Sequence, residues 1–194
     1  MEVPKWLNVP YDSAMQFTSH RDLQLEVFQN LAAYLGLPTD NSDFIHLTPE
    51  NSRRLRALPA WFSLMAYGAE GYRDIVESNC ELARILGKKI ENSHEFNLLA
   101  PVRLNVVCFT LSGNEISSDA IAKFLAALCD RGKIFLTPTV YQGIPAMRAA
   151  LVNWRTERKD IEIAWESLLE TRNLCRVLQR FVKNAAISSE NSIP

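Results

Sequence analysis

The sequence lacks any pair of cysteines or histidines at the spacing of a metal site. Its four cysteines are Cys80, Cys108, Cys129 and Cys175, and none of them forms a C-x-x-C pair. The three histidines are scattered through polar stretches. A zinc site and a disulfide framework are therefore not expected. We expect no bound metal and four reduced thiols, most of them buried.

The sequence also lacks an excess of charge of either sign. Lysine and arginine total 21, and aspartate and glutamate total 22. This balance gives no strong field to attract nucleic acid or an anionic membrane. No apolar run is long enough to span a bilayer, and the first residues lack the layout of a secretory signal. We therefore expect a cytoplasmic protein without nucleic-acid or membrane partners.

The N-terminal quarter of the chain combines short apolar stretches with many turn formers. Residues 11–17 favour a short strand, and residues 21–35 favour a helix over part of their length. Residues 36–51 contain clustered turn-forming residues and two prolines, which predicts a long loop. Loops of this length inside a domain are commonly functional or disordered.

Two helices are predicted next, over residues 52–67 and 69–90. Ser52 is the expected N-cap of the first helix, and Gly68 is its expected stop. Pro59 predicts a kink inside that helix. Trp61 and Phe62 are interpreted as core residues. Together the two helices define a connecting segment, residues 52–92.

The hydrophobic period changes after residue 92. Residues 96–99, 104–111, 133–140 and 146–154 favour strands, and two helices are expected after Ser117 and Thr156. The order β-β-α-β-β-α predicts an α+β domain over residues 93–182, with helices packed on an antiparallel sheet. Residues 183–194 are polar and are predicted to form a disordered tail.

Four blocks of residues resemble a known family, in the family's order and over nearly the whole chain. The blocks are PKWLNVPYD (4–12), SRRLRALPAWF (52–62), APVRLNVVCF (100–109), and Arg148 followed by Arg155-Thr156 and Ala164-Trp165. They resemble the C-terminal part of the group II pyridoxal-phosphate-dependent amino-acid decarboxylases, in particular the aromatic-L-amino-acid branch. One departure is Pro4, where the family usually has a histidine before its cofactor lysine.

The resemblance implies the C-terminal part of a fold-type I pyridoxal-phosphate enzyme. Residues 1–51 then correspond to a remnant of the cofactor-binding large domain with a catalytic-loop-like segment, and residues 93–182 to the small domain. The family places several groups upstream of these blocks. They include the residue that stacks on the pyridine ring, the aspartate that pairs with the ring nitrogen, and most phosphate ligands.

The resemblance also implies roles for three residues. Lys5 is expected to bind pyridoxal 5'-phosphate as a Schiff base, although an exposed lysine is the commoner interpretation of any single lysine. Tyr34 corresponds to a mobile-loop tyrosine that protonates the carbanion at Cα, and a tyrosine that packs its ring with its hydroxyl in water is an equal alternative.

Ser52 is the third such residue, at a turn that lies near the cofactor phosphate in the family. A plain N-cap is the alternative for its side chain. The neighbouring Arg53, Arg54 and Arg56 either pair with carboxylates across an interface or form a solvated helix face. The catalytic candidates are thus Lys5 and Tyr34, and the cofactor-binding candidates are Lys5 and Ser52.

Two functions remain open at this point. The first is pyridoxal-phosphate-dependent decarboxylation of an L-amino acid, preferably aromatic, to its amine and carbon dioxide, in a homodimer. The second is an inactive truncated fragment that acts as a dimerisation or interaction module, or an incomplete gene product. Without the large-domain sheet, residues 5–51 are expected to expose apolar side chains and to promote association.

Overall fold

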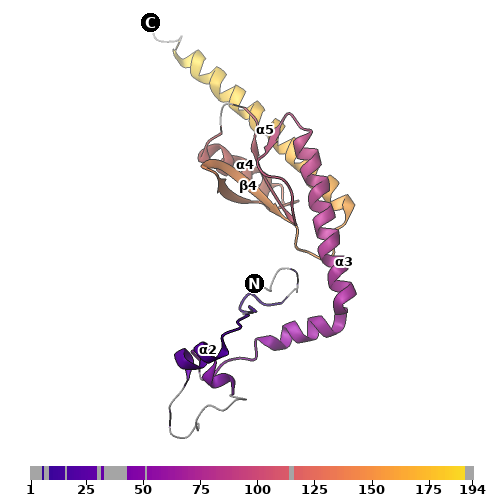
Figure 1. The fold of residues 1–194 in the computed structure, drawn as a ribbon. Helices are drawn as coiled ribbons and strands as arrows, with labels where there is room; N and C mark the ends of the chain where they lie inside the picture. The colour runs from indigo at the N-terminus through magenta and orange to yellow at the C-terminus, as the bar shows by residue number, and fades with distance from the viewer. Residues whose placement is uncertain are drawn as a thin grey trace. The chain divides into compact units, whose positions relative to one another are not determined.

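The computed structural model describes residues 6, 9–15, 17–29, 32, 43–50, 52–113 and 116–190, with side chains described up to residue 178. The chain divides into two units, Met1–Tyr72 and Arg73–Pro194. Figure 1 shows the elements of both. The division falls inside the predicted connecting segment, and each unit is described by itself below.

The N-terminal unit contains α2 (Arg21–Phe28), the short 3-10 helix η1 (Phe44–His46) and the beginning of α3 (Ala57–Glu91). The α2 helix confirms part of the helix predicted over 21–35. Its Gln24 donates from Nε2 to the Leu47 carbonyl at 2.8 Å, which connects α2 to the turn after η1. Large apolar side chains are exposed along this unit, as predicted: they include Tyr11, Phe17, Val27 and Phe44.

The strand predicted over residues 11–17 is wrong for the described residues. Tyr11 and Asp12 form a turn, and Ala14 makes only an isolated bridge. The Ser13 amide donates to the Pro10 carbonyl at 3.1 Å. The turn that follows Pro10 therefore uses a backbone donor that a strand would have given to a neighbouring strand.

The α3 helix begins five positions later than predicted, so Ser52 is not its N-cap. Because the helix starts at Ala57, Pro59 lies in the first turn, where a backbone nitrogen has no partner within the helix. Proline is tolerated there, and the predicted kink at Pro59 is wrong. The helical geometry is interrupted instead at Gly68, where φ is 61° and ψ is −173°. That conformation is essentially restricted to glycine, which confirms Gly68 as the boundary of the first predicted helix.

The C-terminal unit contains a four-stranded antiparallel sheet with the order β1-β2-β4-β3. Its strands are β1 (Phe96–Leu98), β2 (Val106–Leu111), β3 (Thr137–Tyr141) and β4 (Ile144–Ala150). Gln142 and Gly143 join β3 to β4 with φ values of 49° and 80°. Positive φ at both positions is typical of the tight turns that connect antiparallel strands. The predicted β-β-α-β-β-α order is confirmed.

The helices of this unit are the rest of α3, α4 (Ser118–Asp130) and α5 (Arg158–Glu190). Ser117 caps α4 as predicted, because its Oγ accepts from the Ala120 amide at 3.1 Å. The α5 helix begins after Thr156, and its first turn is held by Asp160, whose Oδ2 accepts from the Glu157 amide at 2.8 Å. It extends to Glu190, further than the sequence predicted.

One face of the sheet carries the hydrophobic core. Alternate residues of β2 and β4 lie on this face, and Phe109 is paired in register with Met147. Both are fully buried, together with Ile90 of α3, Phe124 of α4 and Leu168 of α5. All three helices therefore pack on the same face of the sheet, which confirms the predicted packing of helices on an antiparallel sheet.

Candidate functional site

In the N-terminal unit, the segment after the predicted cofactor lysine packs against the start of α3. Ser13 donates from Oγ to the Arg56 carbonyl at 2.9 Å. Beside this bond, Val9 and Ala60 are buried and Met15 packs against them. The first two blocks of the family resemblance, which are about forty residues apart in the chain, are therefore brought together in the fold.

Two arginines of the SRRLR motif form ion pairs with this segment and with the preceding loop. Arg54 pairs with Asp12. Arg56 lies between two carboxylates, with its Nε 3.8 Å from Asp12 Oδ2 and its Nη2 3.1 Å from Glu50 Oε1. These side chains are between about two-fifths and two-thirds exposed, so each pair contributes about 1 kcal/mol at most. The pairs fix the orientation of the segment more than they stabilise the fold.

Arg53 differs from its two neighbours, because it has no acidic partner among the described residues. It lines a cavity of about 660 Å³ in the N-terminal unit. The cavity combines charged groups, including Arg53, Arg54 and Asp12, with apolar side chains that include Met15 and Leu64. A cation that no carboxylate neutralises, beside an apolar wall, is suited to an anionic group that is attached to an apolar body.

The structure places one of the three predicted site residues. Ser52 is exposed and directly precedes Arg53 in a non-helical stretch before α3. Since α3 begins at Ala57, the positive end of the helix dipole lies beyond Ser52, and the predicted helix N-terminus at Ser52 is absent. Lys5 and Tyr34 lie outside the described residues.

The described residues fit a phosphate group better than they fit a pyridine ring. The Ser52 hydroxyl and the Arg53 guanidinium are phosphate ligands of ordinary chemistry. A protonated ring nitrogen requires a carboxylate, and the nearby Asp12 and Glu50 are both paired with arginine. The described residues of this unit therefore do not make a complete pocket for pyridoxal phosphate by themselves.

Sequence reasoning missed the acidic partners of this site. It named the arginines, but not Asp12 or Glu50. The available signal was one acidic residue in PYD (10–12) and another in PEN (49–51), which could each have been considered as a partner for the arginine-rich SRRLR motif. Arg54 and Arg56 do pair with carboxylates, but these lie in the same unit, whereas the sequence interpretation placed such pairs across an interface.

The core assignment of Trp61 and Phe62 is wrong. Trp61 is 53% exposed and Phe62 is 58% exposed. They stack edge to face, with ring centroids 5.0 Å apart. Met65 is exposed nearby on the same helix, and the three residues together are called the α3 apolar patch below. A patch of this kind is typical of a surface that another protein covers.

Known proteins are similar to this chain over most of its length. The family model for the pyridoxal-dependent decarboxylase conserved domain matches residues 2–112. The aromatic-L-amino-acid decarboxylase of Manduca sexta is 27% identical over 167 residues, which cover 84% of this chain and 32% of that protein. The 3,4-dihydroxyphenylacetaldehyde synthase of Drosophila melanogaster is 34% identical over 127 residues, which cover 65% of this chain and 24% of that protein.

Solved structures show the same fold. The Catharanthus roseus tryptophan decarboxylase matches with a TM-score of 0.61 and 24% identity, over 70% of this chain and 30% of that one. Mouse CSAD matches with a TM-score of 0.65 and 18% identity, over 80% of this chain and 35% of that one. The chain thus spans about a third of the length of these relatives. Among the described residues, no helix is both long and apolar enough to cross a membrane.

Proposed function

Because the chain belongs to the pyridoxal-dependent decarboxylase family, we propose that it carries the cofactor lysine and part of the active site of an amino-acid decarboxylase. The reaction is the conversion of an L-amino acid to its amine and carbon dioxide. The observation that carries the proposal is the family match over residues 2–112, which includes Lys5, Tyr34 and Ser52. The similarity to aromatic-L-amino-acid decarboxylases supports an aromatic substrate.

Pyridoxal 5'-phosphate, when bound, supplies an electron sink for the electrons that remain on Cα after carbon dioxide leaves. In the proposed site the Lys5 amine attaches the cofactor, and the Tyr34 phenol returns a proton to Cα. Ser52 and Arg53 bind the phosphate, a role supported by the finding that Arg53 has no acidic partner in the part of the chain that the structure describes.

The first experiment tests attachment separately from catalysis. Pyridoxal 5'-phosphate is added to the purified chain, the adduct is reduced with borohydride, and the labelled lysine is mapped by mass spectrometry. We expect the label at Lys5 and its loss in Lys5→Arg, with Lys88→Arg as the matched control at an exposed lysine of α3. A label spread evenly over surface lysines would contradict the assignment of Lys5.

The second experiment tests the reaction. Aromatic L-amino acids are supplied to the chain with the cofactor, and carbon dioxide, amine and aldehyde are measured separately. Carbon dioxide and amine in equal amounts support decarboxylation. An aldehyde product would instead favour the chemistry named for the 3,4-dihydroxyphenylacetaldehyde synthase that the chain resembles.

A second candidate function is association without catalysis, and the α3 apolar patch favours it. Trp61, Phe62 and Met65 lie on the same helix, and each of them is more than half exposed. Covering such side chains with a second copy would remove apolar surface from water, at about 25 cal/mol per Å². We propose that the chain forms a homodimer through this patch. Label at Lys5 without turnover, together with dimer formation, would favour this function over the first.

A further inference from the structure

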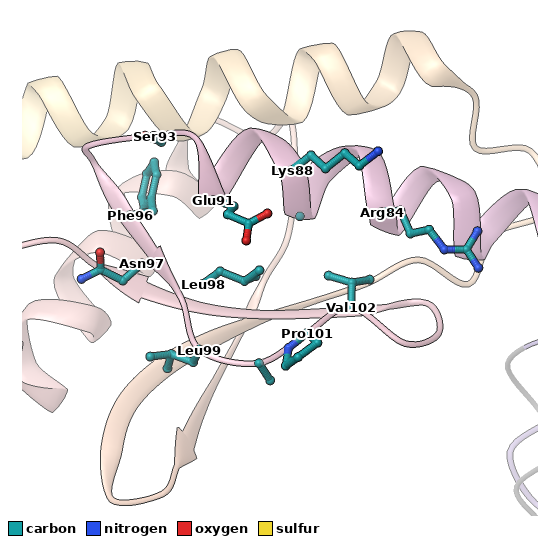
Figure 2. A pocket seen from close by; sticks show the side chains of 12 residues that line it. Arg84, Lys88, Glu91, Ser93, Phe96, Asn97, Leu98, Leu99, Pro101 and Val102 are labelled. Carbon is teal, nitrogen blue, oxygen red and sulfur yellow. The ribbon is translucent and has the colours of Figure 1, made fainter.

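The C-terminal unit contains a cavity that the proposed reaction does not use. Its volume is about 580 Å³, and it lies between the last turns of α3 and residues 93–102. Figure 2 shows its lining from close by. All of its lining residues belong to the C-terminal unit, whereas the predicted site residues Lys5, Tyr34 and Ser52 belong to the N-terminal unit.

One side of the cavity is closed by a contact between helix and loop. A Cβ atom at Gly87 would lie 2.5 Å from Cγ2 of Val102, so the α3 backbone meets the loop after β1 directly. The floor beside this contact is apolar and consists of Leu98, Leu99 and Val102, which are half-buried. Because these side chains are incompletely covered, an apolar ring placed on them would remove further surface from water.

The charge that faces this floor is negative. Figure 2 shows the Glu91 carboxylate pointing from α3 toward Leu98, and Glu91 has no basic partner among the described residues. The ammonium group of Lys88 and the guanidinium of Arg84 point away from Leu98 in the same view. Arg84 is also paired with Glu81, with its Nη1 3.1 Å from Oε2. Of the three charged side chains that line the cavity, the Glu91 carboxylate is thus the one that points toward the floor in this view.

We propose that this cavity binds a small primary amine that carries an aromatic ring. The ring lies on Leu98 and Val102, and the ammonium group donates to the Glu91 carboxylate. An ammonium group has three donors and no acceptor, which matches an acceptor-only partner. An amino acid with the same ring has an additional carboxylate, which Glu91 repels. The site thus distinguishes an amine from the amino acid that yields it by decarboxylation, although the proposal does not rest on the proposed function.

Binding is tested on the whole chain by NMR, with amide shifts followed during titration. The probes are 2-phenylethylamine, phenylalanine and 3-phenylpropionate, which share a ring and differ in charge. We expect 2-phenylethylamine to give saturable shifts at millimolar concentration, confined to residues near 84–102, and to bind several-fold more tightly than phenylalanine. The affinity should fall as salt is added, because Glu91 is exposed.

A variant pair assigns the binding to Glu91. Glu91→Gln removes the carboxylate, and we expect an affinity about tenfold lower, the amount that one hydrogen bond to a charged group contributes. Glu77→Gln removes the same charge from an exposed position of α3 outside the cavity, and it should bind the amine as the unmodified chain does. Three results would each overturn the proposal: equal affinity for the three probes, unchanged affinity in Glu91→Gln, or shifts confined to the N-terminal unit. None of these measurements depends on decarboxylase activity.

Discussion

Gly87 and Val102 lie so close together that residue 87 has no space for a side chain. The nearest Val102 atom, Cγ2, is 2.5 Å from the position that a Cβ would occupy. Both residues adjoin the main core, because Leu86 is 2% exposed and Val102 packs against the core cluster. The contact therefore fixes how α3 and the loop between β1 and β2 meet.

Gly87→Ala should lower the free energy of unfolding by about 1–3 kcal/mol, the usual cost of overpacking. Alanine is preferred over glycine in a helix by about 1 kcal/mol, so destabilisation here would mean that the steric cost is larger. Urea unfolding followed by circular dichroism measures the change. Gly71→Ala is the matched control on α3, since its Cβ would meet only the Tyr67 side chain, at 3.1 Å. This contact is longer than the one at Gly87, so a smaller steric cost is expected. Equal destabilisation by both variants would contradict the steric explanation.

Arg172 connects α5 to the sheet through a largely buried side chain. Its Nη2 donates to the Ser112 carbonyl at 2.6 Å, and its Nε lies 3.5 Å from Glu95 Oε2. Arg172→Met removes the donor and leaves Glu95 with Arg176 as its remaining cation. We expect a loss of about 2 kcal/mol in unfolding free energy.

The control for Arg172 is a more exposed ion pair, which joins the same helix to the C-cap residue of α4. Glu170 pairs with Arg131, and the Glu170 side chain is 51% exposed. Glu170→Gln should therefore cost less than about 1 kcal/mol. A cost for Glu170→Gln as large as that for Arg172→Met would show that burial does not determine the difference.

Two cysteines make stability depend on pH in the alkaline range. Burial raises the pKa of Cys108 and of Cys175 above the ordinary value of 9.0, while Arg148 and Arg172 partly oppose the shift. The unfolded chain therefore loses these thiol protons at a lower pH than the folded chain. This contribution to stability is complete below pH 9.0 and is lost as the pH rises through the folded-state pKa values.

Chemical unfolding between about pH 8 and pH 10.5 measures this dependence, a range from about one unit below to about one and a half units above the ordinary value of 9.0. The double variant Cys108→Ala, Cys175→Ala should have a shallower loss of stability with rising pH than the unmodified chain. Cys129→Ala removes one thiol from an exposed position and serves as the control. Identical slopes in the double variant and the unmodified chain would contradict the prediction.

The α3 apolar patch should control self-association. Met65 is 67% exposed, and Met65→Lys places a charge in the middle of the proposed contact. We expect a dimer dissociation constant at least about tenfold higher, measured by sedimentation velocity. Ser78→Lys adds the same charge at an exposed position of α3 outside the patch and should leave association unchanged. The homodimer proposal fails if the chain is a monomer at all concentrations tested.

The C-terminal unit could be predicted from its sequence because its signals are local. The β2 residues alternate between the core and the opposite face, and Ser117 and Gly132 mark the two ends of α4. The hydrophobic period, the N-cap residue and the glycine that ends the helix all indicate the same element there. The predicted order of the elements is therefore correct. The buried residues of α4 are Ile121, Phe124 and Leu128, which recur at helical spacing.

The N-terminal unit was predicted less well because its structure depends on contacts between distant residues. The sequence pattern over 11–17 favoured a strand, but the turn after Pro10 prevented it. The pairing of Asp12 with Arg54 joins residues 42 positions apart, which no local spacing reveals. Trp61 and Phe62 are apolar enough for a core, yet periodicity identifies a helix face without saying what covers it. Lys5 and Tyr34 were assigned by resemblance alone, and both assignments stay predictions.

The backbone at Gly68 has a consequence for how this sequence can vary. In an uninterrupted helix over 57–91, each residue would be rotated by about 100° from the one before it. The direction of each apolar side chain around the helix axis would then be fixed relative to all the others. Gly68 has a non-helical backbone, with φ of 61° and ψ of −173°, so the side-chain directions before it do not determine those after it. The residues that make the apolar patch before Gly68 and those that pack on the sheet after it need not follow a common heptad. A length change on one side of Gly68 can therefore be tolerated without turning the buried side chains of the other side out of the core.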